Sequence, residues 1–330
     1  MATIGLIVNP AAGRDIRRLA GSAVVSDNYA KRRTAAAVLA GLSIGPAVTV
    51  LAMPDRAGLA ADAIERADDA RVDARLLDMP VRGDREDTQE AAARFADRTD
   101  AVVVLGGDGT TRDVALRVDD VPIAAVSTGT NNVVPTHVDG TVAGAAAGFV
   151  ATTTAVEALT TAHDMVEVTI EEPDRSRTVR ALATAGVVDR PFVGTRAILH
   201  GADFVGGVVS RATAGDIGLS GIAGALTAHA PDDPGGVALT LGPPDSADRA
   251  VRCVPVPGIV ERVGIRDWTR LEDGEDHHFA VSGAVVSVDG ERDIAVTDAT
   301  VRMRPVTDGP RLVRFFDAMA AAQEAGYFEA

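Results

Sequence analysis

The sequence contains very few cysteine, lysine and aromatic residues. Its single cysteine, Cys253, excludes a disulfide framework within the chain and is typical of a reducing compartment. We expect Cys253 to be a small, half-buried side chain. Lys31 is the only lysine, so the remaining cations of the chain are arginines and histidines. Aromatic residues account for 3% of a chain that is 46% hydrophobic, so its core must consist mainly of Val, Ala, Leu and Ile.

Positive charge is also scarce. Acidic residues outnumber Lys and Arg by 47 to 32, which gives a net charge of −15. Basic patches supply much of the affinity of proteins for nucleic acids and anionic membranes, so this charge argues against both partners. An acidic, lysine-poor, alanine-rich composition is typical of halophilic proteins from a high-salt cytoplasm. An acidic mesophile protein is the alternative.

The sequence shows no evident signal peptide or membrane span, and we expect a cytoplasmic protein. The N-terminal MATIGLIVNPAAG has only a short apolar run and no basic residues before it. The longest uncharged stretch, Gly140–Val156, is too short and too rich in Gly, Ala and Thr to cross a bilayer comfortably. The spacing of Gly140, Gly144 and Gly148 lets two helices approach closely, so we expect tight internal packing.

The chain of 330 residues exceeds the usual size of a single domain, which favours two domains. Predicted strands and helices alternate over the first 135 residues, and the continuous apolarity of Val102–Leu105 predicts a central strand covered on both faces. These signals predict an α/β domain of the Rossmann-like, parallel-sheet class. The expected strands are Ile4–Val8, Val48–Met53, Val72–Leu77, Ala101–Leu105 and Pro122–Val126, and the expected helices are Thr34–Leu42, Ala57–Ala67, Arg85–Arg98 and Thr110–Leu116.

Beyond about residue 163, short β-branched segments separated by Gly, Pro or Asp predict an antiparallel β-rich domain. Its expected strands are Met165–Ile170, Thr178–Val188, Val237–Leu241, Val251–Val256, Ile259–Ile265, Ala284–Val288, Ile294–Val296 and Thr300–Met303, with a helix inside Gly206–Ala228. The C-terminal segment returns to a helical period, with Leu312, Phe315, Phe316 and Met319 along one side. We expect domains at residues 1–140 with 310–330, and at residues 141–309.

The stretch VVVLGGDGTTRDVA, residues 102–115, carries the clearest candidate site. A strand that ends at Gly106 and Gly107 leaves the sheet at its carboxyl edge, where ligands bind in open α/β folds. The glycines let backbone N–H groups approach a phosphate, and the N-terminus of the next helix favours an anion. Asp108 repels phosphate, a conflict that is resolved if it serves a hydroxyl nucleophile or a Mg²⁺ ion bridging the phosphates. The alternative is a turn in which Asp-Gly is only favourable turn chemistry.

Two further polar loops follow predicted strands: VNPAAGR at residues 8–14 and STGTNNVVP at residues 127–135. Their hydroxyls and amides suit a ribose or phosphate, and the three loops can converge on one cleft; three ordinary loops are the alternative. The lysine of a Walker motif, GxSxG, HExxH and paired CxxC motifs are missing, which disfavours common nucleotide hydrolases, serine hydrolases and zinc enzymes. We interpret the acidic Glu272–His278 as a solvated loop and assign no protein metal site.

GGDGT at Gly106–Thr110, together with VNPAAG and GTNN, resembles the ATP-NAD kinase and diacylglycerol kinase superfamily. STGTNNVVP and the Gly/Ala-rich segment after it are most similar to its AcoX-type branch. VDGERDIAV at Val288–Val296 resembles the Asp-Gly turn near the end of the family's β domain. The resemblance implies an α/β domain and a C-terminal β domain, with the last helix returning to the first domain.

Carried onto this sequence, the resemblance makes Asp108 the acid/base that activates the substrate hydroxyl. The implied phosphate- or nucleotide-binding residues are Asn9, Gly13, Gly106, Gly107, Gly109, Thr110 and Thr111. The implied substrate-binding residues are Thr128, Gly129, Thr130, Asn131, Asn132 and Asp216, and Arg14 or Arg112 would supply a cation. The chain departs from the family where VVP replaces an LGF-type continuation, and where Thr213–Ser220 stands for the TGST-type loop.

The leading hypothesis is a Mg²⁺-dependent kinase that transfers a phosphoryl group from ATP or polyphosphate to NAD(H), giving NADP(H). We expect a homo-oligomer with a small-molecule substrate and with neither nucleic acid nor membrane as a partner. The alternatives are a kinase of the same fold for a sugar or another alcohol, and a non-catalytic sensor of NAD(P) or ATP. Asp108 favours catalysis, because a pure binder gains little from a carboxylate beside phosphate.

Overall fold

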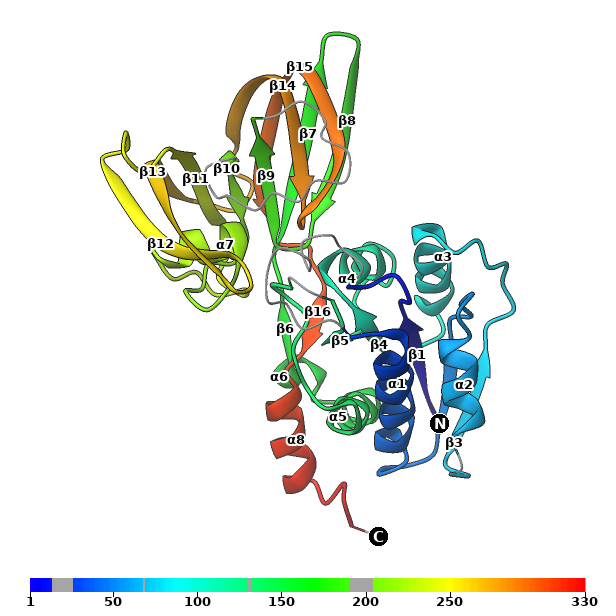
Figure 1. Ribbon diagram of the computed structural model, residues 1–330. Helices are drawn as coiled ribbons and strands as arrows, with labels where there is room; N and C mark the ends of the chain where they lie inside the picture. Colours follow the sequence, from blue (N-terminus) through cyan, green and yellow to red (C-terminus); the bar gives the residue numbers. More distant parts are fainter. Residues whose placement is uncertain (14–25, 68, 130–131, 190–203, 330) are drawn as a thin grey trace. The chain divides into compact units, whose positions relative to one another are not determined.

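The computed structural model describes residues 1–13, 26–67, 69–129, 132–189 and 204–329, apart from the side chains of Arg292 and Asp293. The chain forms two compact units. Of the described residues, those of 1–13, 26–162 and 310–329 belong to unit 1, and those of His163–Gly309 belong to unit 2. Figure 1 labels the elements of both units. The change of composition near residue 163 therefore coincides with the boundary, whereas the expected boundary at residue 140 lies ahead of a helix that belongs to unit 1.

Unit 1 is built on a seven-stranded, mostly parallel sheet. The strands from β1 to β5 pair in parallel, and β16 pairs in parallel with β5 and antiparallel with β6. In spatial order they are β3 (Val72–Leu76), β2 (Val48–Ala52), β1 (Ala2–Val8), β4 (Ala101–Gly106), β5 (Ile123–Ser127), β16 (Arg311–Val313) and β6 (Thr160–Ala162). The five strands expected in this part of the sequence are all present.

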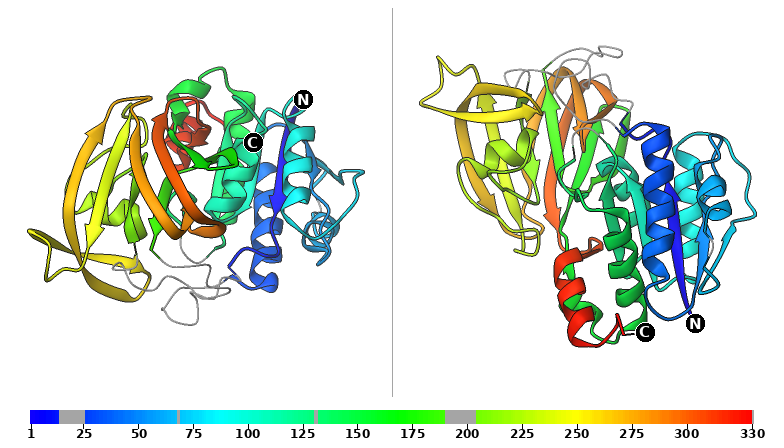
Figure 2. Two further views of the ribbon diagram at one scale, coloured as in Figure 1. Left: turned by 90° about the horizontal axis from the view of Figure 1, so that it is seen from above. Right: turned by 60° about the horizontal axis from the view of Figure 1, so that its bottom comes forward.

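Helices cover both faces of this sheet. Four of them pack on one face, namely α1 (Asn28–Leu42), α2 (Leu59–Glu65), α5 (Gly140–Thr152) and α8 (Phe315–Glu324), while α3 (Arg85–Phe95) and α4 (Asp108–Ala115) pack on the other (Figures 1 and 2). A short α6 (Val156–Leu159) follows α5. Successive residues of a strand face opposite sides, and in β4 Val103 and Leu105 join the first core while Val102 and Val104 join the second. The prediction of a central strand covered on both faces is confirmed.

Helices α1 and α5 lie in direct backbone contact. A Cβ atom added to Gly144 would lie 2.1 Å from the Val38 carbonyl oxygen, and one added to Gly41 would lie 2.0 Å from that of Thr141. Gly140 likewise faces the Thr34 carbonyl oxygen, 2.6 Å from its added Cβ. The glycine spacing of α5 therefore provides the tight internal helix packing that the sequence predicts.

The C-terminal segment returns to unit 1, as the family resemblance implies. The expected helical face is nevertheless wrong in detail, because Leu312 lies in β16 and the helix begins only at Phe315. Phe315 is buried in the core, whereas Phe316 is 71% exposed. Neighbouring residues of a helix point in directions about 100° apart, so one of these two phenylalanines must face solvent.

Unit 2 contains a nine-stranded sheet in which every pairing is antiparallel. In spatial order the strands are β12 (Arg249–Val256), β13 (Ile259–Leu271), β11 (Gly236–Gly242), β10 (Phe204–Val209), β9 (Thr184–Val188), β14 (His277–Val288), β15 (Glu291–Val306), β7 (Met165–Glu172) and β8 (Arg175–Ala181). Helix α7 (Gly218–Gly224) packs on the half made by β10 to β13, inside the range expected for a helix. The antiparallel β-rich prediction is confirmed.

Three strand predictions in unit 2 are wrong. The expected strand Thr178–Val188 is divided into β8 and β9, and the two expected strands between residues 294 and 303 are one strand, β15. The division follows from Asp289, whose carboxylate accepts N–H groups from Leu182, Ala183 and Thr184 at 2.7–3.1 Å. Asp289 has a φ of 49° and Gly290 a φ of 78° in the turn that joins β14 to β15, so the Asp-Gly pair makes this hairpin.

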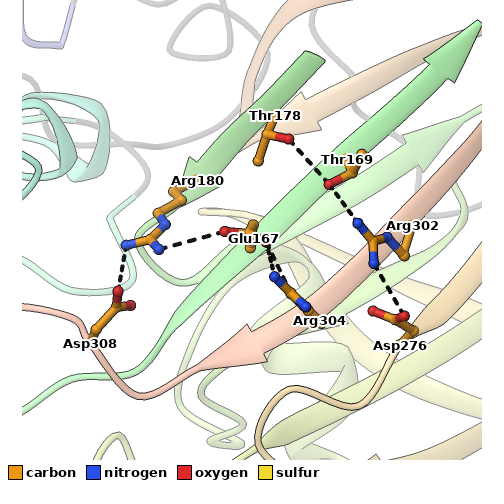
Figure 3. Close-up of polar contacts among 8 residues, drawn as sticks. All are labelled: Glu167, Thr169, Thr178, Arg180, Asp276, Arg302, Arg304 and Asp308. Carbon is orange, nitrogen blue, oxygen red and sulfur yellow. Dashed lines mark hydrogen bonds and ion pairs between the residues drawn. The ribbon is translucent and has the colours of Figure 1, made fainter. Parts of the chain in front are cut away.

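Arginine and carboxylate side chains alternate on the polar face of β7, β8 and β15 (Figure 3). Glu167 binds Arg304 and Arg180, and Arg180 also pairs with Asp308 at 2.9 Å. Ion pairs of this partly exposed kind typically contribute less than about 1 kcal/mol each. Their signs alternate, so this face carries no concentrated charge of one sign.

Two adjacent side chains at the start of unit 2, His163 and Asp164, have shifted pKa values of opposite sense. Burial lowers the pKa of His163 to about 4, and burial raises the pKa of Asp164 to about 6. As the pH falls from 6.5 to 4, His163 becomes protonated in the unfolded state but stays neutral in the folded state, so the protein loses stability. Folded Asp164 takes up its proton near pH 6 whereas an unfolded aspartate does so near 3.8, so stability is gained over that range.

We therefore expect His163 and Asp164 to change the stability in opposite directions on acidification, and single variants to separate their contributions. His163→Asn should remove about 2 kcal/mol of the stability lost between pH 7 and pH 5, since a shift of one pKa unit corresponds to about 1.4 kcal/mol. Asp164→Asn should make the loss of stability on acidification steeper. Urea unfolding of both variants at pH 7 and pH 5 measures the difference. Parallel pH profiles for His163→Asn and the wild type would contradict the expectation.

Candidate active site

Three loops meet at the carboxyl edge of the unit 1 sheet, after the adjacent strands β1, β4 and β5. We name them the NPAAG loop (residues 9–13), the GGDGT loop (residues 106–110) and the STGTNN loop (residues 127–135). The Asn9 N–H donates to the Leu105 carbonyl at 3.0 Å, and the Asn9 side-chain amide donates to the Thr110 hydroxyl at 2.7 Å. The Thr128 N–H donates to the Gly106 carbonyl at 2.9 Å. The NPAAG loop and the STGTNN loop thus each contact the GGDGT loop.

The GGDGT loop joins β4 directly to α4. Gly107 is the N-cap residue and Asp108 already belongs to the helix, so Asp-Gly is not an isolated turn. The first N–H with an acceptor inside the helix is that of Thr111, which donates to the Gly107 carbonyl at 3.0 Å. The N–H groups of Asp108, Gly109 and Thr110 therefore lack an intrahelical acceptor. Such a helix end attracts an anion through these groups and through the helix dipole.

The Asp108 carboxylate is directed at the STGTNN loop. Its Oδ2 accepts the Val133 N–H at 2.8 Å and its Oδ1 accepts the Val134 N–H at 2.9 Å. The side chain is 5% exposed. One bond to each oxygen fixes the plane of the carboxylate. These bonds direct the carboxylate to the Val133 and Val134 amides of another loop, and the N-cap residue of α4, Gly107, has no side chain that could cap the helix.

Two glycines and Asn132 lock the GGDGT and STGTNN loops together. Cβ atoms added to Gly107 or to Gly129 would each lie 2.8 Å from the Asn132 Oδ1. The Asn132 Nδ2 donates to the Ser127 hydroxyl at 2.6 Å, and this hydroxyl lies 3.3 Å from the Nε2 of His137. Asn132 therefore packs the two loops and binds Ser127. This is a different use of its amide from the substrate contact that the resemblance implies.

The remaining predicted residues of unit 1 are placed as follows. Thr111 is fully buried and its hydroxyl donates to the Gly107 carbonyl at 3.1 Å, so it supports the loop from inside. Thr128 is 2% exposed, and its hydroxyl has no hydrogen-bond partner within the described part of the chain. Gly13 has a φ of 75°, a conformation that favours glycine. Arg14, Thr130 and Asn131 lie outside the described residues.

Two charged residues predicted as site candidates, Asp216 and Arg112, lie close to other charged side chains. Asp216 lies in unit 2, where it binds both the Nε and a terminal nitrogen of Arg211 at 2.9 Å and accepts the Ser220 hydroxyl at 2.7 Å. Arg112 is 3% exposed and lies 3.8 Å from the Asp113 carboxylate.

Sequence reasoning missed two features of this edge. The backbone amides of Val133 and Val134 hold Asp108, and nothing in the identity of two apolar residues signals that role. Lys31 lies beneath the NPAAG loop, and its status as the only lysine was the available signal.

The fold and the three loops define an α/β–β protein of the ATP-NAD kinase class, with GGDGT at the start of a helix. A family model described as the ATP-NAD kinase N-terminal domain matches residues 4–156, and one described as the Acetoin catabolism protein X C-terminal domain matches residues 164–308. Acetoin catabolism protein X of Cupriavidus necator is 35% identical over 302 residues, which cover 88% of this chain and 84% of the relative. The chain belongs to the AcoX branch of the ATP-NAD kinase superfamily.

Two solved structures that are similar to this chain are a yeast kinase and a bacterial kinase. Yeast NADH kinase, solved in complex with NADH, aligns with a TM-score of 0.56 at 13% identity, covering 100% of this chain and 89% of that chain. A diacylglycerol kinase from Bacillus anthracis aligns with a TM-score of 0.35 at 13% identity, covering 94% of this chain and 96% of that chain. Family and fold together support a phosphotransferase of the kinase type. None of the helices in the described residues has the length and apolarity required to cross a membrane.

Proposed function

We propose that this protein is a kinase that transfers the terminal phosphoryl group of ATP, or of inorganic polyphosphate, to a hydroxyl of NAD(H). The observation that carries the proposal is the position of Asp108. Its carboxylate is fixed by two backbone N–H groups at the point where the three loops meet, in the first turn of a helix whose free end suits phosphate. A catalytic base must lie close to the acceptor hydroxyl and to the phosphate that this hydroxyl attacks. The position of Asp108 at the start of α4 supports this role.

In the proposed reaction the phosphate donor binds at the start of α4. The N–H groups of Asp108, Gly109 and Thr110 and the positive end of the helix dipole stabilise the negative charge of the phosphates. The acceptor hydroxyl lies beside Asp108, which takes its proton as the oxygen attacks the terminal phosphorus in line with the leaving group. The bond from that phosphorus to the bridging oxygen breaks, and ADP leaves when ATP is the donor.

Magnesium fits this proposal as an ion bound jointly by protein and nucleotide. Within the described residues no group of three or more His, Cys, Asp or Glu side chains could hold a metal. Mg²⁺ commonly takes one or two carboxylates together with substrate phosphates and water. An ion held at the start of α4 mainly by phosphate oxygens and water would neutralise phosphate charge there and leave Asp108 as the base.

NAD(H) is the favoured acceptor for two reasons. The N-terminal part of the chain matches the ATP-NAD kinase model over residues 4–156, and the fold is that of a protein solved with NADH bound. The STGTNN loop contacts Asp108 through its Val133 and Val134 N–H groups, and the hydroxyl and amide residues in the sequence of this loop suit a ribose. We further propose that Thr128 and Gly129 contact the acceptor and that Asn131 orients it.

A panel assay of acceptors tests the proposal. NAD, NADH and several sugars are each incubated with ATP and Mg²⁺ in molar KCl, and ADP release is followed. The high salt is chosen because of the net charge of −15. ADP release that depends on NAD or NADH supports the proposal, release that depends on a sugar transfers it to another acceptor, and tight nucleotide binding without release in any arm refutes a kinase.

A further inference from the structure

The only lysine of the chain lies beneath the NPAAG loop. Lys31 is in the first turn of α1 and its side chain is almost completely buried, with 1% of the residue exposed. Its ammonium donates to the Pro10 carbonyl at 3.0 Å and to the Ala12 carbonyl at 2.6 Å. Burying an ammonium ion is costly, so its placement under one short loop calls for a function.

These two bonds determine how the peptide groups of the loop are oriented. The peptide bonds are trans, so the C=O of one residue and the N–H of the next point in opposite directions. The carbonyls of Pro10 and Ala12 point inward to Lys31, and the N–H groups of Ala11 and Gly13 therefore point away from it. The Ala11 N–H donates to the Asn9 Oδ1 at 2.8 Å, which stabilises the loop itself. The Gly13 N–H is left directed outward, in a residue whose φ of 75° favours glycine.

The NPAAG loop is also fixed to the GGDGT loop. Asn9 donates its backbone N–H to Leu105 and its side-chain amide to the Thr110 hydroxyl, at 3.0 and 2.7 Å. The outward side of the NPAAG loop thus lies next to the N-terminus of α4. The Ala11 and Ala12 N–H groups both donate to Asn9, so the Gly13 N–H is the group of this loop that can contribute to an anion site beside the start of α4.

We propose that Lys31 is a positioning residue that shapes the NPAAG loop into a second binding element for the polyphosphate chain of the nucleotide. Lys31 acts through the loop backbone, in contrast to the lysine of a Walker motif, which reaches the phosphates directly. The inference rests on the proposed function, since it assumes a polyphosphate ligand at this edge of the sheet. It adds a residue that neither the family motifs nor the sequence pattern identifies.

Calorimetric binding of inorganic tripolyphosphate in the presence of Mg²⁺ tests this role. Lys31→Met removes the charge at nearly constant length, and Arg33→Met makes the same change of charge on an exposed side chain of the same helix. We expect Lys31→Met to raise the Kd at least ten-fold and Arg33→Met to change it less than two-fold. Gly13→Ala, which leaves Lys31 in place but disfavours a φ of 75°, should also weaken binding. Circular dichroism verifies that each variant is folded.

The lysine itself provides a second readout that a purely structural role would not move. In protein labelled with ¹⁵N-lysine, Lys31 gives the single lysine ammonium signal, and we expect tripolyphosphate to shift it. Wild-type protein that binds tripolyphosphate without such a shift, or a Lys31→Met variant that binds it as tightly, would overturn the role of Lys31 while leaving the kinase proposal intact. Failure of the wild type to bind tripolyphosphate or ATP would overturn both.

Discussion

Asp108→Asn is expected to lower kcat by about 10²–10⁴-fold while KM for ATP changes little. General acid–base catalysis by a positioned group typically contributes a factor of this size, and an amide cannot take the proton of the acceptor hydroxyl. Asparagine still offers one oxygen to the STGTNN loop, so only one of the N–H groups of Val133 and Val134 loses its carboxylate acceptor. The loss of that bond should cost about 1–3 kcal/mol of stability, which can be measured separately by unfolding.

The matched control is Asp113→Asn, the same chemical change in the same helix. Asp113 is as buried as Asp108 and binds Arg85 at 2.6 Å and Gln89 at 3.3 Å, away from the loops. We expect this variant to lose stability but to keep a kcat close to that of the wild type. Steady-state kinetics of the three proteins with ATP and NAD compare the effects. Equal kcat values for Asp108→Asn and Asp113→Asn would exclude Asp108 as the base.

Gly144→Ala is expected to destabilise unit 1 by about 3 kcal/mol, at the upper end of typical overpacking effects. Alanine is the better helix former by about 1 kcal/mol, yet its Cβ would lie 2.1 Å from the Val38 carbonyl oxygen, a backbone atom that cannot rotate away. Helices α1 and α5 would have to move apart along their whole contact. Because Lys31 belongs to α1, the movement should also disturb the NPAAG loop.

The chain provides separate probes for the two units. Both tyrosines, Tyr29 and Tyr327, belong to unit 1, and Trp268 belongs to unit 2. We expect the tyrosine near-ultraviolet signal of Gly144→Ala to be lost at lower urea concentration than in the wild type. Gly215→Ala is the control, since its Cβ would have no atom within 4 Å, and its unfolding should be unchanged. A Gly144→Ala protein as stable as the wild type would contradict the observed helix contact.

The sequence predicts those parts of this fold that depend on local patterns. Three local patterns each predict one local structure. They are the unbroken apolar run of Val102–Leu105, the glycines of α5 and the GGDGT stretch. The division between β8 and β9 could not be predicted, because the Asp289 carboxylate that binds Leu182 is 107 residues away. Phe316 was misplaced because a helical period does not show where the helix begins.

The candidate site also has features that the sequence predicts and features that it does not. Strand-end glycines and Asp108 could be located from the sequence, since their positions follow from one strand and one helix. The contacts that set the chemistry are long-range: Asp108 binds amides 25 and 26 residues away, and Asn9 binds a hydroxyl 101 residues away. Asp216 and Asn132 make contacts that their residue types do not predict, to Arg211 and Ser127, while their contacts with a substrate stay predictions.

The most direct test of the account is the product formed from NAD by the wild-type protein and by Asp108→Asn. Each is incubated with ATP, Mg²⁺ and NAD in molar KCl, and NADP and ADP are quantified by mass spectrometry. The account predicts one NADP for each ADP with the wild type, and at least a hundred-fold less of both with Asp108→Asn. ADP formation without NADP, or NADP formation that survives the loss of the Asp108 carboxylate, would contradict it.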